Sequence, residues 1–352
     1  MNYPYDSPSD LMPPAPTPPP ASEEDADSVR RHFSRLGLSY LIMTVGFMAA
    51  AYAVQFAVLL LAPSLYEAWW FSWAVSLLPL YGVGLPLLWI CLRKIAAAPK
   101  GAPSSSAVPP FGVGSWLTLL VIAFGCMTLG GLAGNLIMSV LSALTGYDYA
   151  FALNGMVSDT PVWFTALCTC VVAPFGEELL FRKLLIDRVR RYGDVTSILL
   201  SGVLFGLFHG NLFQFFYAAL VGMILAYVYT RSGKYLLCVA MHAAINFMGS
   251  VVTPALAQLM IPLTEADLVS GAALEDGSLL WAFLAAFLVA VWQYGVLIAG
   301  IVLFRRRFSE RVLSSGESSL GGRAGHAWLN PGMVACLAVM LALMAVNLIP
   351  PR

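Results

Sequence analysis

Residues 162–186 read VWFTALCTCVVAPFGEELLFRKLLI, and this stretch decides how the 352-residue chain folds. It is long and apolar enough to cross a bilayer, because about 20 apolar helical residues span the hydrocarbon core. Its middle nevertheless holds three ionisable side chains within six residues, Glu177, Glu178 and Arg182. A charge at membrane depth costs roughly 3 kcal/mol on insertion scales, and such groups are kept where they have partners and a function. We therefore expect a functional site inside a membrane helix.

The composition predicts an all-α fold, a polytopic integral membrane helix bundle. Hydrophobic residues make up 59% of the chain and charged residues 11%, with a mean hydropathy of +0.78, whereas a soluble domain carries about 25% charged residues. The net charge of zero gives no indication of a nucleic-acid partner. Nine apolar segments predict about nine transmembrane helices. They lie near residues 38–62, 69–92, 115–144, 162–186, 195–209, 213–230, 235–255, 279–304 and 331–349.

The basic residues predict the orientation of the chain, because Lys and Arg cluster in cytoplasmic loops. If the nine segments cross the membrane in turn, 18 of the 19 Lys and Arg residues lie on the same side of it. Arg352 alone falls on the other side. The opposite connections carry acidic residues and no Lys or Arg. We therefore expect a multi-pass protein of the cell membrane with a cytoplasmic N-terminus and an exoplasmic C-terminus.

Three more polar side chains lie in the apolar segments downstream of the glutamates. His209 ends the run FGLFH at 205–209, and His242 and Asn246 are four residues apart in MHAAINF at 241–247. Residues four apart share a helix face, so His242 and Asn246 point the same way. Short connections between the four segments from 162 to 255 are expected to bring these faces together.

The same spacing separates the two glutamates. Glu178 and Arg182 are four residues apart and predict an ion pair along the helix. Glu177 lies about 100° around the helix from Glu178, and position 181 is Phe, so Glu177 has no such partner and stays free for other work.

A glutamate, two histidines and an asparagine fit hydrolysis chemistry. A carboxylate sheltered from solvent can take a proton from water, and a histidine beside it can orient that water. A second histidine and an asparagine can donate to the oxyanion of a tetrahedral intermediate. The glutamate and two histidines could instead hold a metal such as Zn²⁺. The sequence leaves the metal and cofactor unknown. Each residue alone also has a structural interpretation, as a hydrogen-bonding group between helices.

The three motifs resemble the signature of the CPBP family of intramembrane proteases, also called the CAAX-protease and bacteriocin-processing or Abi family. The family pattern is EExxxR, FxxxH and HxxxN or HxxxD, and residues 177–182, 205–209 and 242–246 match it completely and in order. The resemblance covers roughly residues 160–250. It implies a membrane-embedded endopeptidase that hydrolyses peptide bonds of a peptide or protein substrate with a Glu/His-activated water.

The resemblance also implies roles for individual residues. Glu177 would activate the attacking water with His209, and His242 and Asn246 would stabilise the oxyanion. Glu178 and Arg182 match the motif too, but their predicted ion pair makes them structural support. The family has been described both as metalloproteases and as glutamate-dependent peptidases, so the resemblance leaves metal dependence open.

The sequence is expected to divide into four regions. Residues 1–35 form a Pro-rich cytoplasmic tail that cannot bury apolar area and is expected to be disordered. Residues 36–160 are accessory transmembrane helices, 161–256 the catalytic transmembrane core, and 257–352 the C-terminal transmembrane helices.

Two other functions fit the same residues. One is a non-catalytic membrane peptide-binding or immunity protein with the same fold. The other is a proton-coupled transporter, which also uses intramembrane glutamate and histidine. A transporter commonly shows internal repeats, and none is visible in this sequence.

Overall fold

The computed structural model describes residues 25–97, 111–149, 160–260, 278–308 and 325–349. Every regular element within these ranges is helical, as the all-α prediction requires. Seven of the described helices are long and apolar enough to cross a membrane by length and composition. Two further apolar helices, Asp194–Phe208 and Pro331–Val346, are shorter. The chain is thus an all-α polytopic membrane bundle, and the predicted count of nine spans stays a prediction.

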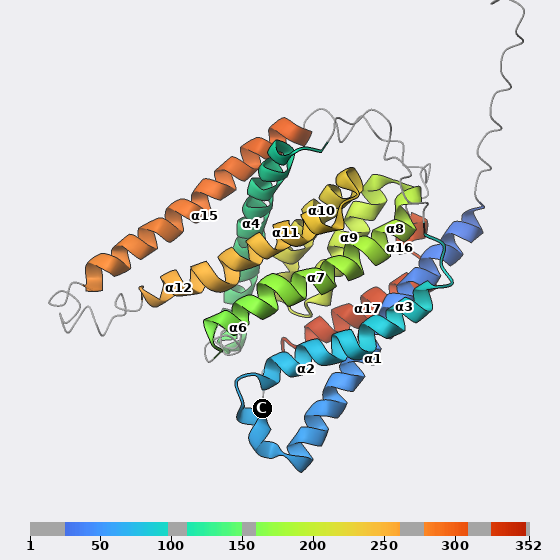
Figure 1. Ribbon diagram of the computed structural model, residues 1–352, viewed down its shortest axis with the longest axis horizontal. Helices are drawn as coiled ribbons and strands as arrows, with labels where there is room; N and C mark the ends of the chain where they lie inside the picture. The colour runs from blue at the N-terminus through green and yellow to red at the C-terminus, as the bar shows by residue number, and fades with distance from the viewer. Residues whose placement is uncertain (1–24, 98–110, 150–159, 261–277, 309–324, 350–352) are drawn as a thin grey trace, which may run out of the picture.

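The described helices carry the labels of Figure 1. In order they are α1 (Ala26–Leu61), α2 (Phe71–Pro79), α3 (Leu85–Leu92), α4 (Val113–Thr145), α6 (Val162–Ala166), α7 (Ala173–Glu178), α8 (Leu185–Val189), α9 (Asp194–Phe208), α10 (Leu212–Ser232), α11 (Tyr235–Phe247), α12 (Thr253–Gln258), α15 (Ser278–Phe308), α16 (Gly325–Trp328) and α17 (Pro331–Val346). Four π-helical turns interrupt longer helices, at Leu80–Gly84, Leu167–Val172, Leu179–Leu184 and Met248–Val252. Short 3₁₀ turns lie at Pro63–Glu67 and Arg190–Tyr192.

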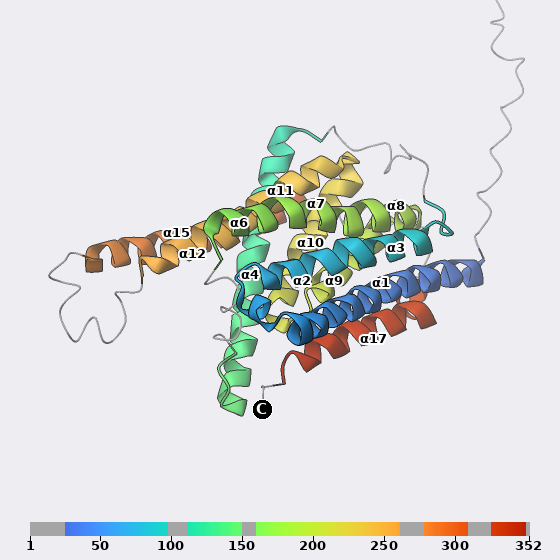
Figure 2. The same ribbon diagram turned by 60° about the horizontal axis from the view of Figure 1, so that its bottom comes forward.

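The helix that carries the glutamates lies in the middle of the bundle. In Figure 2, α17, α1, α3, the run from α6 to α8, and α11 follow one another as neighbouring layers. Figure 1 shows the run from α6 to α8 between α3 and α11, with α15 on the far side of α11. α4 crosses these layers steeply and packs on both α10 and α15. Helices from both ends of the sequence therefore surround the central helix.

Small residues let some of these helices approach closely. Gly130 and Gly134 of α4 lie against the backbone of α10 at Tyr217 and Phe213, and a Cβ at either glycine would overlap that backbone. This small-xxx-small spacing is typical of membrane helix pairs, where van der Waals contact between backbones stabilises association. The contact fixes α10 beside α4, and α10 in turn packs on α9.

Basic segments gather at one end of the bundle. The Nη2 group of Arg188, at the end of α8, donates to the Leu92 carbonyl at the end of α3 over 3.2 Å. Arg231 at the end of α10 pairs with Asp194 at the start of α9, with 3.6 Å between nitrogen and oxygen. Segments predicted to share the cytoplasmic side thus lie at the same end. The side of the membrane that this end faces stays a prediction.

The first helix begins earlier than predicted. The sequence placed residues 1–35 in a disordered tail, but α1 begins at Ala26. Its first turns bury Val29, Phe33 and Leu36 in the hydrophobic core, where the Phe33 ring packs against Tyr192. This burial explains why the helix extends into the supposed tail. The remainder of the predicted tail, residues 1–24, lies outside the described residues.

Candidate active site

The two glutamates lie in a short α-helical segment between two wider turns. α7 holds both of them, and the π-helical turns Leu167–Val172 and Leu179–Leu184 flank it. Pro174 in α7 lacks an N–H group and cannot make the regular bond to the carbonyl four residues earlier. Single π-helical turns are frequent at functional sites, where they change the direction of side chains. The local backbone is therefore adapted to present the glutamates.

Glu178 and Arg182 form the ion pair that their spacing predicts. Arg182 Nε lies 2.8 Å from Glu178 Oε2, and Arg182 Nη2 donates to Glu178 Oε1 over 3.2 Å. Both side chains are fully buried. The third guanidinium nitrogen, Nη1, donates to Ser201 Oγ of α9 over 2.9 Å, and the guanidinium stacks over the Phe205 ring at 4.8 Å. Each of the three guanidinium nitrogens thus lies close to an oxygen of a neighbouring side chain.

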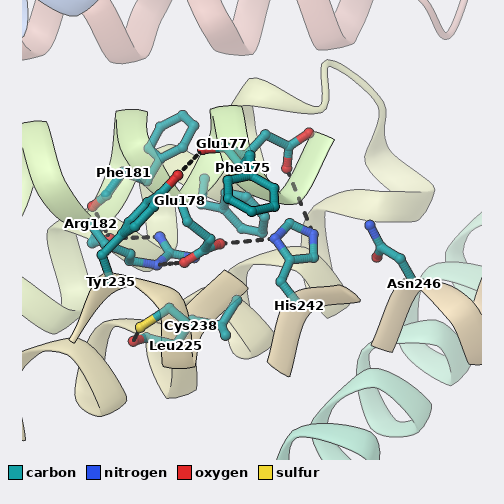
Figure 3. Close-up of polar contacts among 12 residues, drawn as sticks. Phe175, Glu177, Glu178, Phe181, Arg182, Leu225, Tyr235, Cys238, His242 and Asn246 are labelled. Atoms are coloured by element: carbon teal, nitrogen blue, oxygen red, sulfur yellow. Dashed lines mark hydrogen bonds and ion pairs between the residues drawn. The ribbon is translucent and has the colours of Figure 1, made fainter. Parts of the chain in front are cut away.

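His242 of α11 lies between the two glutamates, as Figure 3 shows. Its Nδ1 is 2.9 Å from Glu178 Oε1, and its Nε2 is 3.9 Å from Glu177 Oε2. Glu178 is paired with Arg182 as a carboxylate, so it accepts the hydrogen bond and Nδ1 donates. That bond turns Nε2 toward Glu177. His242 is buried. The Glu178 side chain is fully buried and the Glu177 side chain is 17% exposed, so Glu177 is the more accessible of the two glutamates.

His209 lies at the carboxyl end of α9 and is held by its own helix. Its Nδ1 is 2.8 Å from the Phe205 carbonyl oxygen, which can only accept, so Nδ1 donates and Nε2 is the nitrogen left for other partners. The Phe205 ring packs edge-on against both imidazoles, with centroid distances of 4.9 Å to His209 and 5.6 Å to His242. Within the described residues, no hydrogen bond joins His209 to Glu177. Their predicted partnership stays a prediction, and the imidazole nearest Glu177 here is His242.

Asn246 lies one turn beyond His242 on α11, and Figure 3 shows both side chains on the same side of that helix. Its Nδ2 donates to the Thr169 carbonyl oxygen over 2.7 Å. Thr169 belongs to the π-helical turn Leu167–Val172. The amide nitrogen carries two hydrogens, so one remains for another acceptor. The bond to Thr169 fixes the plane in which that second hydrogen lies.

These donors do not fit a resident metal ion. Over the described ranges, no three His, Cys, Asp or Glu side chains come close enough together to hold one metal. Glu178 is already shared between Arg182 and His242. A zinc site needs three protein ligands within about 2.3 Å of the ion. We therefore derive no step through a metal.

Of the side chains that bond the backbone of the helical run from α6 to α8, only Asn246 is among the residues that the sequence predicts for the site. Five carbonyl oxygens of this run accept hydrogen bonds from side chains of other helices. The donor and acceptor pairs are Asn246 to Thr169, Tyr81 to Val172, Tyr235 to Phe175, Tyr40 to Leu180 and Ser201 to Phe181. The signal was the presence of tyrosines inside apolar segments, because a buried tyrosine hydroxyl needs a partner.

Comparison with known proteins gives a match to a protein-family model. Residues 159–248 match the family model described as type II CAAX prenyl endopeptidase Rce1-like, and this range contains all three motifs. No curated protein and no solved structure matches the chain. The recognition made from the motifs is thereby confirmed, and it supports an intramembrane endopeptidase. Residues 159–248 of this membrane protein thus match an Rce1-like family model, which is consistent with a protease of the CPBP/CAAX family.

Proposed function

We propose that the protein hydrolyses peptide bonds inside the membrane with Glu177 as the general base. The observation that carries this proposal is His242, which has one ring nitrogen 2.9 Å from Glu178 and the other 3.9 Å from Glu177. The gap between Glu177 Oε2 and His242 Nε2 is too long for a direct hydrogen bond and suits one bridging water. A general base can act on such a water at hydrogen-bond distance.

The reaction divides into two steps. Glu177 takes a proton from the water as its oxygen attacks the carbonyl carbon of the substrate peptide bond. The negative charge that develops on the carbonyl oxygen is stabilised by hydrogen-bond donors already in place. We assign this role to His242 Nε2, carrying a proton, and to the second Nδ2 hydrogen of Asn246. Glu177 then gives its proton to the leaving amine nitrogen as the carbon–nitrogen bond breaks.

The remaining residues of the motifs position these groups. The Glu178 carboxylate accepts from His242 Nδ1 and offsets positive charge on the imidazole, as a carboxylate does for a catalytic histidine elsewhere. Arg182 holds Glu178 from the other side. His209, with Nδ1 bound to Phe205, has Nε2 free to orient the water, in keeping with the family resemblance. The proposed substrate is a peptide or protein, and the matched family suggests a prenylated C-terminal CAAX sequence.

The test uses the purified full-length chain in liposomes with a fluorogenic farnesylated CAAX peptide and its unprenylated analogue. Wild type is expected to cleave, and Glu177→Gln to lose at least about 100-fold in rate, because general-base catalysis contributes about 10²–10⁴-fold. Glu67→Gln, in the short helix Pro63–Glu67 outside the site, is the matched control and should cleave normally. Cleavage by Glu177→Gln at the wild-type rate would exclude Glu177 as the base.

A second measurement covers substrates outside the CAAX class. New peptide termini in membrane fractions that contain wild type, but not Glu177→Gln, would identify the natural substrate. Peptide binding without any cleavage would instead favour the non-catalytic binding function. Proton-coupled uptake of a solute that Glu177→Gln abolishes would favour the transporter.

A further inference from the structure

The matched domain does not contain everything that contacts the helix of the glutamates. Tyr81 lies in the π-helical turn Leu80–Gly84, between α2 and α3, about 80 residues before the matched range. Its hydroxyl donates to the Val172 carbonyl oxygen over 3.1 Å. Val172 is the last residue of the π-helical turn that precedes α7. Tyr81 is therefore bonded to the backbone five residues before Glu177.

The Tyr81 ring makes a second contact with the same helix. A Cβ built at Gly176 would overlap three atoms at the end of this ring, including the hydroxyl oxygen. Gly176 directly precedes Glu177, and it is four residues after Val172, so both contacts lie on one helix face. The ring thus rests against the helix backbone at Gly176, where any larger residue would push the ring or the helix away.

We propose that Tyr81 is a positioning residue that holds Glu177 against the reacting water, so that the accessory helices complete the active site. This inference rests on the proposed role of Glu177. The Val172 bond fixes the height of the helix relative to α2 and α3, and the Gly176 contact fixes its distance. Among the described residues, the Glu177 side chain has no ion pair along its own helix and lies 3.9 Å from the His242 imidazole, so its place depends on the backbone that carries it. A displacement of about 1 Å at a reacting group can lower a rate about 100-fold.

Three variants separate the two contacts. Tyr81→Phe keeps the ring and removes only the Val172 bond, so a loss of several-fold in kcat is expected. Tyr81→Leu removes both the bond and most of the ring, and Gly176→Ala forces the overlap; each is expected to lower kcat roughly 10- to 100-fold with little change in KM. The double variant Gly176→Ala with Tyr81→Ala removes the overlap together with the ring, so its loss in kcat should be smaller than the product of the two single losses. Gly82→Ala is the matched control, because no atom lies within 4 Å of its added Cβ.

A measurement independent of cleavage reports on Glu177 directly. The rate at which a water-soluble carbodiimide modifies Glu177 is followed by peptide mass spectrometry on the full chain in liposomes. We expect Gly176→Ala and Tyr81→Leu to change this rate several-fold, the double variant to change it by less than the two single changes combined, and Gly82→Ala to leave it unchanged. Cleavage of the farnesylated CAAX peptide is measured on the same preparations, with Glu177→Gln alongside.

The outcomes distinguish this inference from the proposed function. Unchanged modification rates in Gly176→Ala and Tyr81→Leu overturn the positioning role, whatever the cleavage assay gives. Changed modification rates with unchanged kcat also overturn it, because the position of Glu177 would then not matter to the reaction. If Glu177→Gln cleaves as wild type does, the proposed function fails first, and the positioning role for that reaction falls with it.

Discussion

Replacing Glu178 with glutamine is expected to destabilise the protein, whereas the same change at Glu177 is not. Glu178 and Arg182 are both fully buried and their charged atoms are 2.8 Å apart. Removing one member of a buried pair strands the other charge and typically costs about 3–5 kcal/mol. Glu177 is partly exposed and its one imidazole contact is at 3.9 Å, so its replacement should change stability by about 1 kcal/mol or less.

Thermal unfolding in detergent measures this difference through the cysteines. Cys168, Cys238 and Cys336 are buried free thiols, so a thiol-reactive fluorescent maleimide reports their exposure as the protein unfolds. At roughly 2 °C per kcal/mol for a large domain, Glu178→Gln should lower Tm by about 6–10 °C. Arg182→Gln should do much the same. The double variant should lose less than the sum of the single changes, because the two residues share one interaction.

Lys183 and Asp187 supply the matched control. They form an ion pair at the same four-residue spacing on the same helix, but the Lys183 side chain is 41% exposed. Lys183→Gln should therefore change stability by no more than about 1 kcal/mol. Equal losses of Tm in Glu177→Gln and Glu178→Gln would contradict this difference between the glutamates, as would a loss in Lys183→Gln as large as that in Arg182→Gln. Loss of cleavage is expected in both glutamate variants, since His242 depends on Glu178 for its orientation.

Three further predictions concern other parts of the molecule. Reporter fusions at residue 30 and residue 352 should report opposite sides of the membrane, and the same side for both would mean that one span is miscounted. Gly130→Ala should destabilise by about 1–3 kcal/mol in the same thermal assay, because its Cβ overlaps the α10 backbone at Tyr217; Gly131→Ala, with open space around it, should not. Cleavage should withstand EDTA, since the described donors do not form a three-ligand set; loss of activity that Zn²⁺ restores would contradict this.

Much of the fold could be predicted from the sequence because hydropathy and helical spacing act locally. Each of the nine apolar segments is helical over most of its expected range. The ion pair of Glu178 and Arg182 required only the four-residue spacing along one helix. The start of α1 was misplaced because the burial of Phe33 depends on Tyr192, a partner 159 residues away. No local pattern reports such a contact.

The relation between the glutamates and the histidines could not be predicted for the same reason. Helical spacing assigns faces along one helix, but it does not give the rotation of one helix against another. One ring nitrogen of His242 lies 2.9 Å from Glu178 and the other lies 3.9 Å from Glu177, because α11 packs directly on α7. The π-helical turns on both sides of α7 add a further shift, since each wide turn changes the direction of the residues that follow it. The sequence therefore predicts these polar residues as candidates for a site, but it does not predict which of them lie in contact.

Helices outside the matched range donate hydrogen bonds to the backbone on both sides of the glutamates. Inside a membrane lipid offers no donor, so only groups of the protein can make such bonds to a carbonyl oxygen. Here Tyr81 bonds the Val172 carbonyl and Tyr40 of α1 bonds the Leu180 carbonyl over 2.6 Å. The two accepting carbonyls lie on either side of the glutamates in the sequence. Both donor tyrosines precede residue 159, where the family match begins. Residues 159–248 alone would leave both carbonyls without these donors, so that fragment is not expected to hold Glu177 and His242 in the arrangement of the whole chain.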